Sequence, residues 1–411
     1  MRFVKSILAW TICLAVCILV LQCCGEANRK SVSSIPTDQL PQTELPNPII
    51  DVYVENSGSM DGYVKGVTEF EQIVYNYLSD IKISGLSDTL NLNYINSHII
   101  PQGSDISDFI EKLEPTTFRL RGGDRRTSDI AVILKSILSE MKENSVAIFV
   151  SDCIFSPGRG KDATQYLVNQ QTGIKVAFAD YLNQQTDFSV MAYRCLSHFS
   201  GTYYDCNDSK TKIEEKRPFY IWVMGHKDYL MKMRKLEKSF KGEGIQNIFL
   251  ASVGNVEIPY ALKMGSGKFE LDKKEPKTTL KRGRIGHNGK FSFAVDMDCS
   301  RLLLDDSYIV DNTHYEMNHK DFDLEISKAK NSRYTHTLQF SSDRVVSCQL
   351  LVGLKMQIPA WAEECNDDNG IGINSSTMNK TFGIKYLIGG VYDAFSFKTN
   401  SYTTVKLNIN N

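Results

Sequence analysis

The sequence has no surplus of charge of either sign. Its 47 Lys and Arg residues face 48 Asp and Glu residues, which leaves a formal net charge of -1. No global field therefore selects nucleic acid or an anionic membrane as a partner, and any partner must be recognised by local features. The absence of Cys-x-x-Cys argues against thiol redox chemistry, and no paired Cys and His have the spacing of zinc ligands.

The first 23 residues have the order of a secretory signal peptide. Basic residues precede an apolar run at 7–21, which is too short to favour a membrane-spanning helix. Leu21 and the small Cys23 before Cys24 resemble the lipobox of bacterial lipoproteins. The resemblance implies cleavage before Cys24 and acylation of its thiol, and an uncleaved N-terminal anchor is the alternative. Both predict an exported protein tethered to a membrane of the cell envelope, and lipoprotein processing favours the outer membrane.

Residues 24–46 are polar and rich in Ser and Pro, which predicts a flexible tether. Beyond the signal and Cys24, six cysteines remain, at 153, 195, 206, 299, 348 and 365. An exported compartment permits disulfides, so Cys195 with Cys206 and Cys348 with Cys365 are candidate pairs. The alternative is that they are free thiols, which behave as small hydrophobic residues when buried.

The most informative stretch is Ile49 to Tyr63. A short apolar, β-branched run ends at Glu55 and is followed by Ser57 and Ser59 in a turn. The pattern predicts a strand whose C-terminal end presents a carboxylate and two hydroxyls. Open α/β sheets bind ligands at that end of their strands. Taken alone, the same residues could form an ordinary loop.

In their spacing, Glu55, Ser57 and Ser59 resemble the Asp-x-Ser-x-Ser signature of von Willebrand factor A (VWA) domains, with Glu replacing the usual Asp. These domains hold a divalent cation at a metal-ion-dependent adhesion site. Thr127, before an amphipathic helical pattern, and Asp152, after an apolar strand, match later parts of the family pattern in order. The resemblance implies direct contacts from Ser57 and Ser59, a contact from Thr127 in a liganded state, and contacts from Glu55 and Asp152 directly or through water.

Two carboxylates and three hydroxyls are hard oxygen ligands, which suit Mg²⁺, with Ca²⁺ or Mn²⁺ as alternatives. The resemblance implies a non-enzymatic protein that binds an acidic residue of a protein partner through the ion. Because Glu55 is one methylene longer than Asp, the alternative is a scaffold whose metal site has decayed. A less favoured alternative is a serine hydrolase with Ser57 or Ser59 as nucleophile, although the sequence around them is not Gly-x-Ser-x-Gly.

The 411 residues, 42% of them hydrophobic, are enough for two domains. Apolar strand patterns alternate with helical ones over 47–254, which predicts a Rossmann-like, VWA-like α/β domain with a mainly parallel sheet and helices on both faces. Strands are expected at 49–55, 90–95, 145–150, 188–193, 219–224 and 248–253, with a hairpin between the strands at 188–193 and 219–224. Helices are expected at 70–81, 107–113, 130–141, 162–185 and 230–240.

Over 255–411, short β-rich runs are separated by turn formers such as H-N-G-K and D-D-N-G. They predict a β-rich, sandwich-like C-terminal domain. The segment at 382–387 is expected to be a strand, and the stretch Y-L-I-G-G-V-Y-D-A-F-S-F to form part of a terminal hairpin. No catalytic motif is found in this half.

Overall fold

The computed structural model describes residues 45–126, 129–236, 244–253, 256–330 and 333–411. Residues 46–411 form one compact unit, separate from residues 1–45. The predicted lipidation site, Cys24, and the predicted ligand Thr127 lie outside the described residues. Within the described ranges, no helix has both the length and the apolar content needed to cross a membrane. All six cysteines after residue 45 are free, so the candidate disulfides at 195/206 and 348/365 are not formed.

A seven-stranded sheet in the order β3-β2-β1-β4-β6-β5-β7 lies at the centre of the first part. Its strands are β1 (Ile49–Glu55), β2 (Thr89–Ile95), β3 (Ile99–Gly103), β4 (Ser145–Ser151), β5 (Phe188–Tyr204), β6 (Lys210–His226) and β7 (Ile245–Ser252). β1 is parallel to both β2 and β4, as predicted for a βαβ arrangement. All the other neighbouring pairs are antiparallel. The expectation of a mainly parallel sheet is therefore wrong.

The difference arises in the long hairpin that β5 and β6 form. The apolar runs at 188–193 and 219–224 are only the inner halves of these strands, each of which has 17 residues. Many residues in the outer halves are polar, so the hydrophobicity pattern does not predict strands there. The two strands nevertheless pair along their whole length. Because a tight turn rather than a helix joins them, they must run antiparallel.

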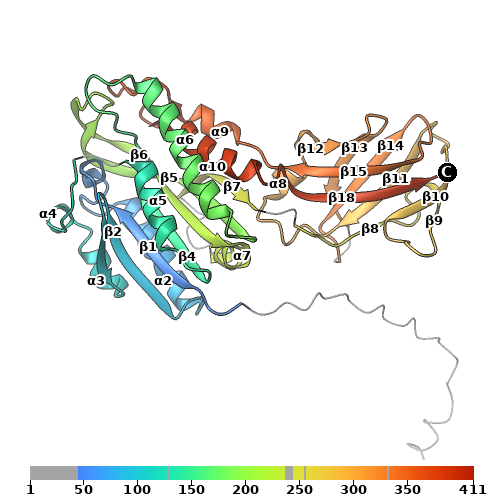
Figure 1. The fold of residues 1–411 in the computed structure, drawn as a ribbon, viewed down its shortest axis with the longest axis horizontal. Helices are drawn as coiled ribbons and strands as arrows, with labels where there is room; N and C mark the ends of the chain where they lie inside the picture. The colour runs from blue at the N-terminus through green and yellow to red at the C-terminus, as the bar shows by residue number, and fades with distance from the viewer. Residues whose placement is uncertain (1–44, 127–128, 237–243, 254–255, 331–332) are drawn as a thin grey trace, which may run out of the picture. The chain divides into compact units, whose positions relative to one another are not determined.

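Helices cover both faces of this sheet. They are α2 (Glu69–Ile83), α3 (Ile106–Glu111), α4 (Pro115–Arg119), α5 (Ile130–Glu140), α6 (Ala163–Leu182) and α7 (Lys227–Arg234). The right-handed crossovers from β1 to β2 and from β2 towards β4 run in opposite directions along the sheet, so they place α2 and α5 on opposite faces. α6 lies beside α5, with Gly173 in contact with Ala131 (Figure 1). The helices predicted at 70–81, 107–113, 130–141 and 162–185 are confirmed in position.

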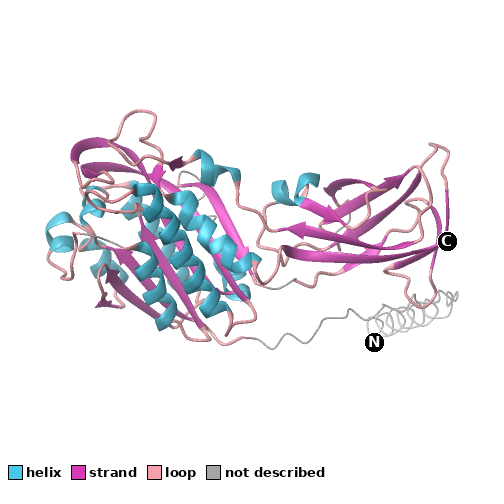
Figure 2. Cartoon of the chain, turned by 45° about the horizontal axis from the view of Figure 1, so that its top comes forward, coloured by secondary structure: helices cyan, strands magenta, loops and turns pink. Residues whose placement is uncertain are grey.

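The second part is built from two sheets of mostly antiparallel strands, which Figure 2 shows as a strand-rich region with few helices. One sheet has the order β12-β15-β18-β10-β9, and the other β13-β14-β11-β8. Their strands are β8 (Tyr260–Leu262), β9 (Lys268–Leu271), β10 (Thr279–Arg284), β11 (Phe291–Met297), β12 (Tyr315–Met317), β13 (Asp323–Lys328), β14 (His336–Ser342), β15 (Cys348–Lys355) and β18 (Ser401–Asn410). Two short turns of helix, α8 (Asp306–Ile309) and η3 (Asn312–His314), precede β12. The predicted β-rich character of this region is confirmed.

Between β15 and β18 the chain forms helices instead of the predicted hairpin. It contains α9 (Ala360–Glu364), the short strands β16 (Asn366–Asp367) and β17 (Thr381–Phe382), and α10 (Ile384–Ser396). The prediction of strand at 382–387 is wrong beyond Phe382, because the apolar residues recur at helical spacing. The buried residues of α10 include Ile384, Leu387, Ile388, Val391, Ala394 and Phe395.

α10 packs lengthwise on α6 (Figure 1). A Cβ added to Gly390 would lie 2.7 Å from the carbonyl oxygen of Gln171 and 2.9 Å from the Cβ of Ile174. The Gln171 side chain donates a 3.1 Å hydrogen bond to Asp393. Residues beyond 254 therefore complete the α/β layer, which the predicted 47–254 range does not include.

We expect Gly390→Ala to lower the free energy of unfolding by about 1–3 kcal/mol, because the backbone of α6 cannot move away from the new methyl group. The matched control is Gly389→Ala, whose Cβ would meet only the end of the flexible Gln171 side chain, 3.0 Å away. Alanine also favours a helix by up to about 1 kcal/mol relative to glycine, so this control should be neutral or stabilising. Urea unfolding of both variants measures the difference, and equal effects would contradict the close approach of α10 to α6.

Candidate metal site

Glu55 ends β1 and lies inside the protein. Only 1% of the residue is exposed, and its carboxylate accepts a hydrogen bond from the hydroxyl of Ser151 at the end of β4. Ser151 Oγ in turn accepts the backbone N–H of Cys153 at 2.8 Å. The two strands are parallel neighbours with Val54 opposite Val150, so their C-terminal ends meet. The position of this carboxylate therefore follows from the sheet.

Asp152 follows β4 and is also buried, with 2% of the residue exposed. Burial, together with the nearby charge of Glu55, raises the pKa of Asp152 to about 7, although hydrogen bonds from Ser59 and from the Ile154 N–H act in the opposite direction. The next residue, Cys153, has a φ of 53°, in the left-handed region that non-glycine residues rarely adopt. Strain of this kind clusters at functional sites.

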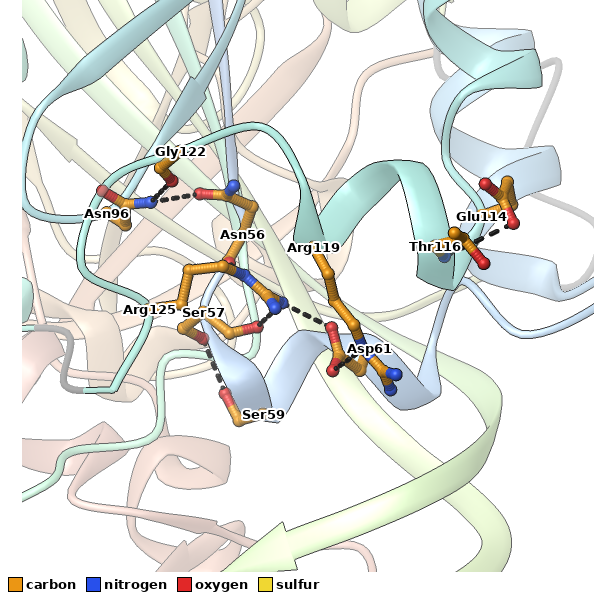
Figure 3. A network of polar contacts seen from close by, with 10 residues as sticks. All are labelled: Asn56, Ser57, Ser59, Asp61, Asn96, Glu114, Thr116, Arg119, Gly122 and Arg125. Carbon is orange, nitrogen blue, oxygen red and sulfur yellow. Dashed lines mark hydrogen bonds and ion pairs between the residues drawn. The ribbon is translucent and has the colours of Figure 1, made fainter.

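Ser57 and Ser59 lie at the start of a 3-10 turn, η1 (Gly58–Gly62), that follows β1. Their hydroxyl oxygens are 2.9 Å apart, as Figure 3 shows. Because Ser59 also bonds Asp152, the hydroxyl pair and the carboxylates belong to one cluster. Within the described ranges, no histidine is hydrogen-bonded to either serine.

Arg125 fastens the loop at 121–126 to the turn that holds the serines. Its guanidinium donates to the carbonyl oxygens of Asn56 and of Ser57, the latter at 3.0 Å, and it pairs with Asp61 (Figure 3). In return the N–H of Gly58 donates to the carbonyl of Arg125 at 3.0 Å. From the sequence, Arg125 could either lie at the rim of the site or be solvated, and the solvated interpretation was favoured because charged residues in a Gly-rich loop are most often solvated.

The structure thus brings together Glu55, Ser57, Ser59 and Asp152, four of the five predicted ligands. The fifth, Thr127, lies outside the described residues, directly after the loop that Arg125 holds. Two residues further on, Asp129 is the N-cap of α5 and accepts the N–H of Val132 at 3.1 Å. The hydroxyl ligand that the VWA resemblance implies at 127 remains a prediction.

Arg217 is a second functional candidate that the sequence did not reveal. It is 2% exposed on β6, and Nη1 donates to the carbonyl oxygens of Met378 and Lys380 at 2.7 and 3.1 Å. Its guanidinium lies over the ring of Tyr203, 5.0 Å from the centroid. Its charge lowers the pKa of Asp152, so the carboxylate pair has one permanent cation nearby.

The outer half of the β5–β6 hairpin covers the turn that contains the serines. A Cβ added to Gly201 would lie 2.7 Å from the Cα of Gly62, so the two backbones are in direct contact. Tyr63 also packs edge-on against Phe199, with ring centroids 4.9 Å apart. The two carboxylates are consequently enclosed, whereas Ser59 and Asp61 are half-buried and form the accessible side of the cluster.

The donor set fits a divalent cation in chemistry and in charge. Two buried carboxylates repel each other, and a bound cation would relieve that repulsion. Over the described ranges no three His, Cys, Asp or Glu side chains are grouped as metal ligands, so a cation here would depend on serine hydroxyls as well.

In comparisons with known proteins, no family model, curated protein or solved structure matches this chain. The described residues form a mixed α/β protein with a seven-stranded sheet, two mostly antiparallel sheets of five and four strands, and the two-stranded pair of β16 and β17. The resemblance to VWA domains therefore rests on the ordered site residues alone.

Proposed function

We propose that this chain is an exported, lipid-anchored protein of the cell envelope that binds a protein partner through a divalent cation and is not an enzyme. The supporting observation is the meeting of two buried carboxylates, Glu55 and Asp152, at the ends of adjacent parallel strands, with the Ser59 hydroxyl on Asp152. Open α/β sheets bind ligands at this end. The lipid anchor at Cys24 is supported by the lipobox resemblance.

Glu55, Ser57, Ser59 and Asp152 would hold the ion, and the VWA resemblance adds Thr127. Mg²⁺ is the proposed ion, with Mn²⁺ and Ca²⁺ as alternatives, because all the donors are hard oxygens. The bound cation would supply the positive charge that attracts an acidic side chain of the partner. That side chain would approach from the side of Ser59 and Asp61, where the cluster is accessible.

Titration calorimetry with MgCl₂, MnCl₂ and CaCl₂ tests the proposal. We expect saturable binding by the wild-type chain and a loss of about tenfold or more in affinity for Glu55→Gln, because the variant removes one of two charges from the site. Asp51→Asn is the matched control, since Asp51 lies at the other end of β1 and bonds Asn91 at 2.8 Å. Equal affinities in all three proteins, or no binding in any, would contradict a cation at this site.

A scaffold without a metal is the second candidate, and Arg217 favours it. This arginine supplies a positive charge beside Asp152, and the raised pKa of Asp152 lets a proton supply another. Neutralised in this way, the cluster would keep its shape without an ion. The absence of binding heat, together with an unchanged melting temperature in Mg²⁺, would support the scaffold.

A further inference from the structure

The chain has a net charge close to zero, but residues 263–290 form a strongly basic region. It has nine Lys and Arg residues and three acidic residues, whereas the rest of the chain has a surplus of seven acidic residues. Two of the acids are already paired within the region, Asp272 with Lys281 and Glu270 with Arg282. Lys263 and Lys290 pair with acids outside the region, Asp296 and Asp323. The exposed cations without an ion pair in the described structure are Lys268, Lys273, Lys274, Lys277 and Arg284.

β9 and β10 lie side by side (Figure 1), and part of this charge lies at one end of the pair. Lys268 at the start of β9 lies opposite Arg284 at the end of β10. The turns at 263–267 and 285–290, which adjoin these two residues, therefore lie at the same end. Each turn presents an apolar side chain to solvent: Met264 is 73% exposed and Ile285 is 40% exposed.

One explanation of these cations is protection of a sheet edge, because lysines on an edge strand prevent unwanted pairing with other strands. β9 is an edge strand of its sheet. That explanation covers Lys268. It does not cover the exposed Met264 and Ile285, because an apolar side chain at a turn gives no protection against pairing. Cations that surround exposed apolar side chains are instead the composition of surfaces that rest on anionic lipid.

We propose that this basic end, defined by Met264, Lys268, Arg284 and Ile285, docks on the anionic lipid surface of a membrane. The cations would lie among the lipid headgroups, and the two apolar side chains would enter the boundary with the acyl chains. The anchor proposed at Cys24 would keep the chain close to such a surface. The docking itself does not depend on the metal site or on its occupancy.

Vesicle flotation with residues 46–411, which form a compact unit without the signal and tether, tests the docking. The vesicles are phosphatidylcholine alone, or phosphatidylcholine with about 30% phosphatidylglycerol, in about 0.1 M salt. We expect binding to the anionic vesicles only. The double variant Lys268→Glu, Arg284→Glu should bind them at least about tenfold more weakly, because each cation at the surface contributes separately.

The matched control is Lys135→Glu, Lys212→Glu, which changes the net charge equally at exposed residues elsewhere. It should retain wild-type binding, and Met264→Ser with Ile285→Ser should weaken binding without changing its salt dependence. Equal losses of vesicle binding in the two double variants would overturn the proposal, as would binding to a soluble polyanion such as heparin without any binding to vesicles. Circular dichroism melting of each variant shows that the fold is intact.

Discussion

Asp152→Asn is expected to abolish Mg²⁺ binding and, in the metal-free protein at pH 8, to raise the free energy of unfolding by about 2–4 kcal/mol. Both effects have one cause. Asp152 is 2% exposed beside Glu55, so its negative charge destabilises the folded protein unless a cation neutralises it. Asparagine has nearly the same shape but no charge. A residue that binds a metal and opposes folding in its absence is the pattern expected of a functional site.

The pH dependence of the same variant gives an independent measurement. The pKa of Asp152 is raised from 3.8 to about 7 in the folded state, so the folded protein holds this proton more tightly than the unfolded chain. The contribution of Asp152 to the free energy of unfolding should therefore fall as pH rises from about 4 to about 7 and then level off. Urea unfolding without metal gives the free energy of unfolding of the wild type and of Asp152→Asn at each pH. The difference between the two isolates the contribution of Asp152. A difference that is flat with pH would contradict the raised pKa.

The proton and the metal compete for the same carboxylate. Mg²⁺ affinity of the wild type should rise about tenfold between pH 6 and pH 8, because a group with a pKa near 7 is mostly protonated at the first pH and mostly ionised at the second. Calorimetry at the two pH values measures this ratio. If Mg²⁺ binds equally well at both, Asp152 is not among its ligands.

Arg217→Leu is expected to destabilise the protein by about 3–5 kcal/mol, the usual cost of breaking a buried charged network on one side. The substitution leaves the carbonyl oxygens of Met378 and Lys380 without their donor and leaves Asp152 without its neighbouring cation. These carbonyls belong to the segment between β16 and β17, far from β6 in sequence. The arginine therefore joins distant parts of the chain at the candidate site.

Two controls separate the roles of this arginine. Arg217→Lys keeps the charge but lacks the planar fork that donates to several carbonyls at once. Its free energy of unfolding is therefore expected to lie between those of the wild type and Arg217→Leu. Arg126→Leu removes an arginine that is 87% exposed and should change stability by less than about 0.5 kcal/mol. Urea unfolding measures the free energy of unfolding of each variant. If Arg217→Leu lowers it no more than Arg126→Leu does, the hydrogen bonds and charge of Arg217 contribute nothing to stability.

Most helices and the inner sheet strands of the first part could be predicted because their apolar periodicity agrees with the structure they form. β1 and β4 are short apolar runs buried between helices, and their ends placed Glu55 and Asp152 correctly at one edge. α10 could not be predicted, since its Ile, Val and Phe residues favour strands locally, and packing on α6 overrides that preference. A hairpin was predicted between 193 and 219, but the full length of β5 and β6 was not, because many residues in the outer halves of these strands are polar.

The sequence alone determined which side chains can act at the candidate site, because chemistry depends on residue type and the end of a buried strand can be read from the apolar pattern that precedes it. Glu55, Ser57, Ser59 and Asp152 were predicted from these strand ends together with their resemblance in order to the VWA pattern. Only the tertiary structure decided what surrounds them. Arg125, Arg217 and the glycine contact between Gly62 and Gly201 act across long sequence separations, and such contacts leave no local pattern. These contacts enclose the carboxylates and set their charge balance.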